Sequence, residues 1–219
     1  MTNFNIAITS DNVCPWCYVG KKKLERGISL YKAAHPASDD KFTTTWLPFY
    51  LNPAAPKTGV NKRSYYKSRF GDEKAAMIIE RLAAVGKGAG IDFSFGGKTG
   101  NTRDSHRLVE LGKTKGAEMQ TRVVEELFKS YFEGEGDITS HDMLKEAGVR
   151  AGLKEAEVKS WLESDKGGEE VDKEVAEAQT RGVSGVPNFV LQGKYEIGGA
   201  QDAEAFVKVF ERVKEMEES

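Results

Sequence analysis

The stretch Cys14-Pro15-Trp16-Cys17 contains both cysteines of the 219-residue chain. Residues 4–10 before it alternate apolar and polar side chains, which predicts a strand, and apolar residues at helical spacing follow it. Two cysteines at this spacing can close into a disulfide on the first turn of a helix, where the helix dipole favours the thiolate of the first cysteine. A C-x-x-C between a strand and a helix therefore predicts a redox-active dithiol.

The two cysteines are expected to have different roles. Cys14, at the very start of the helix, is predicted to be the more exposed thiol and the attacking nucleophile, whereas Cys17, one turn further, resolves the mixed disulfide. Pro15 stiffens the first turn, and Trp16 adds bulk without a positive charge. We therefore expect a less stabilised thiolate and a more reducing couple than in strong oxidants. Pro15 and Trp16 are also expected to contact the substrate.

A metal site or a pair of inert thiols is the alternative for the same two cysteines. A four-ligand zinc site needs two further ligands, and the chain offers only His35, His106 and His141, none at the spacing of a zinc motif. We therefore expect no bound metal and no resident cofactor.

Composition limits the partners of the chain. Hydrophobic residues make up 39% and charged residues 30%, and 32 basic against 34 acidic residues give a net charge of −2. This balance provides no electrostatic argument for nucleic acid or an anionic membrane as a partner, and no apolar run is long enough to span a bilayer. Because Met1–Phe4 lack the features of a secretory signal, we expect a reducing compartment, the cytoplasm. The sequence does not indicate an oligomeric state.

Outward from the dithiol, the chain predicts an α/β unit. A helix over about residues 15–34, stopped by His35-Pro36, and a strand over residues 42–51 complete a parallel βαβ unit with the first strand. Pro48 lies inside the second strand and cannot donate a hydrogen bond, so this strand should lie at an edge of the sheet or end there.

Helical periodicity dominates from residue 64 to about residue 164. After this block come a helix ended by Gly182, a predicted hairpin over residues 185–199 and a last helix from about Asp202. The order βαβ, insertion, αββα is that of the thioredoxin fold, in the α/β class. We therefore predict a thioredoxin-like domain formed by residues 1–60 and 166–219, with an all-helical domain, residues 61–165, inserted into it.

Six stretches of the chain match a known family in its order. They are Ser10–Lys21, Leu51–Pro53, Asn101-Thr102, His106–Leu108, Gly182–Pro187 and Gly198–Gln201. In these stretches the sequence resembles the DsbA-like thioredoxin-fold oxidoreductases, and within them the FrnE-like subgroup. The resemblance implies that the helical block caps the active site. It also implies a cis Val186–Pro187 peptide bond close to Cys14, with the Val186 backbone presented to a substrate chain.

Other candidate site residues also have a purely structural explanation. Asn101 and Thr102 suit the start of a helix, and the resemblance suggests that this helix start also faces the active site. His106 is either a proton carrier near the dithiol or a hydrogen-bonded structural histidine. Asn52 ends the second strand, at the rim where α/β folds gather their sites, although turn chemistry explains it as well. Pro187, outside the family context, would simply begin a strand.

Two functions follow from these predictions. The first is a thiol–disulfide oxidoreductase of the reductase or isomerase type, which acts on thiols or disulfides of proteins or small molecules and could use glutathione as a co-substrate. The alternative is a glutathione-dependent isomerase or transferase, because the related 2-hydroxychromene-2-carboxylate isomerases and kappa-class glutathione transferases share the inserted helical domain. Those enzymes typically carry serine where this chain has Cys14, so the two cysteines favour the first function.

Overall fold

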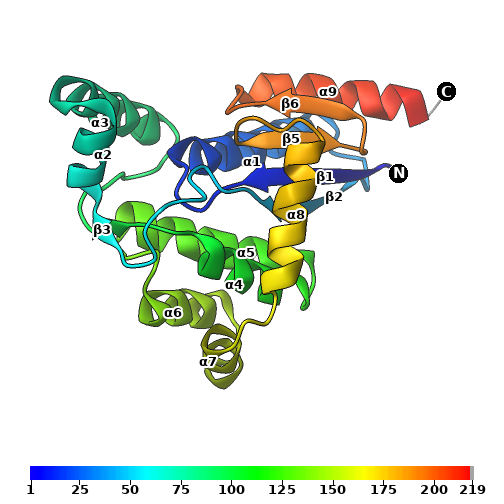
Figure 1. The fold of residues 1–219 in the computed structure, drawn as a ribbon. Coiled ribbons are helices and arrows are strands. Elements are labelled where there is room, and N and C mark those ends of the chain that lie inside the picture. The colour runs from blue at the N-terminus through cyan, green and yellow to red at the C-terminus, as the bar shows by residue number, and fades with distance from the viewer. Residues whose placement is uncertain (218–219) are drawn as a thin grey trace.

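A four-stranded mixed sheet forms the centre of the computed structural model, which describes residues 1–217 (Figure 1). Strand β1 (Asn3–Ser10) lies between β2 (Lys41–Pro48), which is parallel to it, and β5 (Asn188–Leu191), which is antiparallel to it. Strand β6 (Tyr195–Gly198) pairs antiparallel with β5 at the far edge. This strand order, with its βαβ and αββα halves, confirms the predicted thioredoxin fold.

Helices α1 (Pro15–Ala34) and α9 (Ala203–Glu217) cover one face of the sheet. The predicted inward side chains of β1, Phe4, Ile6 and Ile8, are all buried there. Aromatic rings from both helices and two strands fill this interface: Phe4, Tyr31, Phe42 and Phe210. Full burial of one such side chain stabilises the fold by about 1.5–3 kcal/mol, so this face anchors the helix that carries the dithiol.

The segment between β2 and α8 (Gly168–Thr180) is mainly helical. Its helices are α2 (Lys62–Phe70), α3 (Asp72–Gly88), α4 (Arg103–Lys113), α5 (Ala117–Phe128), the π-helical turn η1 (Lys129–Glu133), α6 (His141–Ala151) and α7 (Glu155–Glu163). Figure 1 shows α2 and α3 set apart at one side of the sheet and α4 to α7 beneath it. Within residues 1–217, no helix is long and apolar enough to cross a membrane.

The prediction of an all-helical insertion is wrong in one detail. Strands β3 (Val60–Asn61) and β4 (Lys98–Thr99) form a short antiparallel pair. Val60 and Thr99 lie opposite each other in it. Both are β-branched residues, which pack well on a pleated surface, and the pair joins the base of α2 to the segment before α4.

Helix α5 closes the sheet edge at β2. The N–H of Trp46 donates to Oε1 of Gln120 (3.0 Å), and Nε2 of Gln120 donates to the carbonyl oxygen of Trp46 (2.8 Å). Gln120 is buried, so one side-chain amide satisfies both backbone groups of Trp46, which the edge strand leaves open. Strand β2 lies at the edge and also ends at Pro48, so both parts of the proline prediction are confirmed and the predicted range 42–51 was too long.

One continuous hydrophobic core joins the sheet to the helical segment. Tyr18, on α1, stacks on Phe128 of α5 with ring centroids 5.0 Å apart. Its hydroxyl donates to Oε1 of Glu133 at 2.7 Å. Tyr18 therefore has a core role, and the division of the chain at residues 60 and 165 remains a prediction.

Candidate active site

The dithiol lies where β1 passes into α1. Cys14 is the residue before the helix, in an extended conformation (φ −87°, ψ 111°), and Pro15 is the first helical residue. The turn is held by hydrogen bonds from Cys14 N–H to the Asp11 carbonyl (3.0 Å) and from Cys17 N–H to the Cys14 carbonyl (3.1 Å). Proline suits the first helical position because the N–H that it lacks would have no partner there. Both cysteines are free thiols.

The two thiols have different surroundings. Cys14 is 4% exposed and lines a cavity, whereas Cys17 is 1% exposed and lies outside the cavity lining. Burial raises the pKa of the Cys17 thiol well above its ordinary value, and the neighbouring Cys14 raises it further, against smaller opposing contributions from Ser10 and the Asp11 backbone. Cys17 is therefore protonated at neutral pH, as a resolving thiol should be before its partner has reacted.

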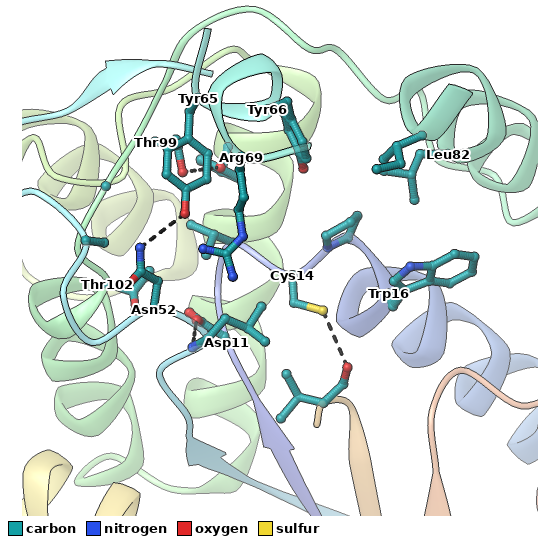
Figure 2. Close-up of a pocket in the computed structure, with 18 of the residues that line it drawn as sticks. Asp11, Cys14, Trp16, Asn52, Tyr65, Tyr66, Arg69, Leu82, Thr99 and Thr102 are labelled. Atoms are coloured by element: carbon teal, nitrogen blue, oxygen red, sulfur yellow. Dashed lines mark hydrogen bonds between the residues drawn. The ribbon is translucent and has the colours of Figure 1, made fainter. Parts of the chain in front are cut away.

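A second segment, distant in the sequence, meets the first thiol. The Val186–Pro187 peptide bond is cis. The Cys14 thiol donates to the carbonyl oxygen of Val186, with 3.6 Å between Sγ and oxygen (Figure 2). Helix α1 can lie against this segment because Gly20 has no side chain: a Cβ there would come within 2.9 Å of Cγ of Pro187. Residues 172 positions apart are thus in contact at the thiol.

A cavity of about 440 Å³ opens beside Cys14 (Figure 2). The sheet side contributes the dithiol segment 13–16, the loop after β2 and Val186. The helical segment contributes residues from α2, α3 and the loop before α4, together with Tyr131 of η1. The helical block therefore covers the dithiol, as the family resemblance implied.

Asn52 and Thr102 line this cavity and Asn101 does not. Nδ2 of Asn52 donates to the hydroxyl of Tyr65 at 3.2 Å, so Asn52 holds a residue of α2 over the cavity. Thr102 precedes α4, but the side chain that caps this helix is Asn101, whose Oδ1 accepts from the N–H of Arg103 at 3.0 Å. The capping explanation therefore accounts for Asn101.

His106 is a buried structural histidine and not part of the cavity wall. Its Nδ1 lies 3.5 Å from Nδ2 of Asn12, which can only donate, so Nδ1 accepts and Nε2 carries the proton. Nε2 then donates to the carbonyl oxygen of Phe49 at 3.1 Å, with Oδ1 of Asp11 at 3.4 Å. The idea of a proton carrier facing the dithiol is thereby corrected, because both ring nitrogens are turned towards the protein.

Sequence reasoning missed much of the cavity wall, including Asp11, Tyr66 and Arg69. Asp11 is 1% exposed, and its Oδ2 accepts from the N–H of Leu51 at 2.8 Å. Tyr66 and Arg69 come from α2. Burial raises the pKa of Tyr66 to about 12, and the charge of Cys14 adds to the effect, so the phenol stays protonated and can donate a hydrogen bond. Asp11 lies in a family-matching stretch, whereas the polar sequence of α2 carries no such signal.

The family model for the DSBA-like thioredoxin domain matches residues 5–211. The chain belongs to the DsbA-like thioredoxin family. Its structure is similar to that of a probable DsbA oxidoreductase from Streptomyces coelicolor, with a TM-score of 0.83 and 28% identity over 94% of this chain and 88% of that chain. The DsbA-like chain is also 26% identical, over 93% of its length and 94% of the relative, to the uncharacterized protein YwbO of Bacillus subtilis (strain 168). The cytosolic disulfide reductase DsbM from Pseudomonas aeruginosa, in a structure with GSH, shares the fold, with a TM-score of 0.64 and 13% identity over 96% and 99% of the two chains.

In this DsbA-like chain the site brings together a thiol at a helix start, a second buried thiol and a cavity of ligand size. Within the described residues 1–217, no three His, Cys, Asp or Glu side chains gather in a way that could hold a metal ion. In this arrangement a substrate sulfur can reach Cys14, and Cys17 lies one helical turn further along α1.

Proposed function

We propose that this DsbA-like chain, which we assign to the FrnE-like subgroup, is a thiol–disulfide oxidoreductase of the reductase or isomerase type. The observation that carries the proposal is the Cys14 thiol: it faces the cavity, 3.6 Å from the Val186 carbonyl oxygen, and Cys17 lies buried and protonated behind it. A reactive thiol that faces a cavity, backed by a protonated partner, is what disulfide exchange requires.

The proposed reaction transfers two electrons to a disulfide R–S–S–R′. The Cys14 thiolate attacks one sulfur, forms a Cys14–S–S–R bond and releases R′–S⁻. Cys17 then gives up its proton and attacks Sγ of Cys14, which closes the Cys14–Cys17 disulfide, releases R–S⁻ and leaves one proton for the departing thiolates. Two molecules of glutathione, our proposed co-substrate, would reduce the enzyme again and leave as the disulfide.

The surrounding residues are proposed to position the substrate. The backbone of Val186, followed by Pro187, would face the attacked sulfur on one side. Pro15 and Trp16 also line the cavity, and Asn52 and Thr102 supply polar groups to its wall. Both cysteines of the chain belong to one reactive pair, and neither forms a structural disulfide. We therefore propose that the protein works in a reducing compartment, the cytoplasm.

Disulfide reduction and repair of scrambled disulfides, with glutathione present, test the proposal in wild type, Cys14→Ser and Cys17→Ser. We expect Cys14→Ser to lose both activities, and Cys17→Ser to lose turnover because nothing resolves the mixed disulfide. Activity towards disulfides that survives Cys14→Ser would refute the assignment of the nucleophile.

A glutathione-dependent isomerase or transferase remains the second candidate, because a cavity of about 440 Å³ beside a thiol also suits a small-molecule reaction. Such a reaction needs bound glutathione but no resolving cysteine. Conjugation or isomerisation that persists in Cys17→Ser, without disulfide reduction in the wild type, would favour this candidate.

A further inference from the structure

We propose that Arg69 makes the cavity selective for disulfides whose aromatic or apolar body carries an anionic group such as a carboxylate. This inference rests on the proposed thiol–disulfide exchange at Cys14 and names the substrate class that the same site takes. It concerns the side of the cavity formed by α2, opposite the Val186 segment.

Among residues 1–217, those that line the cavity include two charged side chains, Asp11 and Arg69. Asp11 is 1% exposed and both its oxygens face the protein, Oδ2 towards the N–H of Leu51 at 2.8 Å and Oδ1 towards Nε2 of His106 at 3.4 Å. Arg69, by contrast, is exposed. Of these two charges, that of Arg69 is therefore the one that an entering ligand can contact.

Arg69 has no acidic partner in the described part of the chain. Within residues 1–217, no carboxylate lies within 4.0 Å of its guanidinium, and its recorded contact is with the ring of Phe70, 5.8 Å from Cζ to the centroid. Lys67 on the same helix is paired with Asp72 at 2.9 Å. Figure 2 shows the Arg69 side chain reaching from α2 into the space between Asn52 and Cys14. An anion bound there would lie close to the reacting thiol.

The walls around this cation are largely aromatic and apolar. Tyr65 and Tyr66 flank Arg69 on α2, Trp16 lies across the cavity, and Ile78 and Leu82 come from α3. Such walls give the aromatic or apolar body of a ligand a surface to pack against, next to the guanidinium. The guanidinium of arginine can also bind a carboxylate through two parallel hydrogen bonds. The cavity volume of about 440 Å³ suits a small molecule.

Two chromogenic disulfides test this selectivity, because they differ in charge and share an aromatic body. One is 5,5′-dithiobis(2-nitrobenzoate), which carries a carboxylate on each ring, and the other is the neutral 4,4′-dithiodipyridine. Their reaction with reduced protein is followed by stopped-flow absorbance in wild type, Arg69→Gln and Arg63→Gln. Arg63 is the matched control, since it lies on α2, is exposed and does not line the cavity.

We expect Arg69→Gln to slow the reaction with the anionic probe by about tenfold and to leave the neutral probe within about twofold of wild type. Arg63→Gln should change the ratio of the two rates by less than about twofold. The neutral probe also shows whether Cys14 of the variant is as reactive as in wild type, and circular dichroism shows whether the variant is folded.

If the anionic probe reacts equally fast with Arg69→Gln and wild type, or if both probes slow by the same factor in Arg69→Gln, the role of Arg69 is overturned. The proposed function is left intact by either result. The role of Arg69 is also overturned if the disulfides of insulin react faster than the anionic probe and react equally fast with Arg69→Gln and wild type. The cavity would then bind a polypeptide substrate. If reduced wild type reacts with neither probe, the proposed function itself fails.

Discussion

Cys17 lies one helical turn below Cys14, and burial keeps its thiol protonated while the Cys14 thiol faces the cavity. The difference comes from packing, since both residues belong to the same four-residue stretch. Cys17 lies next to Ser10 and the Asp11 backbone at the end of β1, whereas Cys14 precedes the first helical turn and donates to the Val186 carbonyl. A buried thiol with a raised pKa also affects how the stability of the fold depends on pH.

The pH dependence of stability tests the protonation of Cys17. Above pH 9.0, the ordinary pKa of the thiol, the unfolded chain releases this proton while the folded protein retains it. The unfolded state is then favoured, so the contribution is present below pH 9.0 and is lost as pH rises above it. Between about pH 9 and 10, we expect the free energy of unfolding of reduced wild type to fall by about 1 kcal/mol more than that of Cys17→Ala, because the unfolded thiol is only about half ionised at pH 9. Urea titrations at fixed pH measure it, and parallel pH profiles for the two proteins would contradict a buried, protonated Cys17.

Among the elements, α2 and α5 decide what surrounds the dithiol. Helix α5 covers the outer edge of β2 through Gln120, and its π-helical continuation brings Tyr131 to the cavity. Helix α2 also contributes to the cavity wall and is tied to the loop after β2 by the hydrogen bond from Asn52 to Tyr65. Local π-helical turns are often found at functional sites, and this one lies directly behind the cavity.

Gln120→Ala tests the closure of the sheet edge by α5. The change leaves the buried N–H and carbonyl of Trp46 without partners, so we expect a loss of about 1–3 kcal/mol in the free energy of unfolding. Gln179→Ala is the matched control, because Gln179 is an exposed glutamine on α8. Urea denaturation of both variants measures the difference. An equally small effect in the two variants would mean that water replaces the Gln120 amide and that α5 does not close the edge in this way.

For the molecule as a whole, the continuous core predicts that the sheet and the helical segment unfold together. Variants that keep only Trp46, on β2, or only Trp161, on α7, report on the two parts. In each variant we expect the fluorescence transition to coincide with the far-UV circular dichroism transition in urea. Two separated transitions in either variant would show that the segment 61–165 unfolds on its own.

The parts of the structure that could be predicted from the sequence are those with local signals. Alternation in β1, the C-x-x-C before α1 and the turns around the β5–β6 hairpin all depend on neighbouring residues, and each predicted element is present. The wall of the cavity depends on long-range packing instead. Nothing in the polar sequence of α2 shows that Arg69 turns towards Cys14, and only the packing against Asp11 and Phe49 decides that His106 faces inwards.

The most direct test of the central claim is to trap the covalent intermediate at Cys14. Cys17→Ser removes the resolving thiol, so a disulfide substrate should remain attached to the protein. We expect intact-protein mass spectrometry of Cys17→Ser, treated with the anionic aryl disulfide, to show one attached thiol, and peptide mapping to place it on Cys14. Cys14→Ser under the same conditions should remain unmodified, because its remaining thiol is buried and protonated. An adduct on Cys17 in Cys14→Ser, formed as fast as the adduct on Cys14 in Cys17→Ser, would contradict the account.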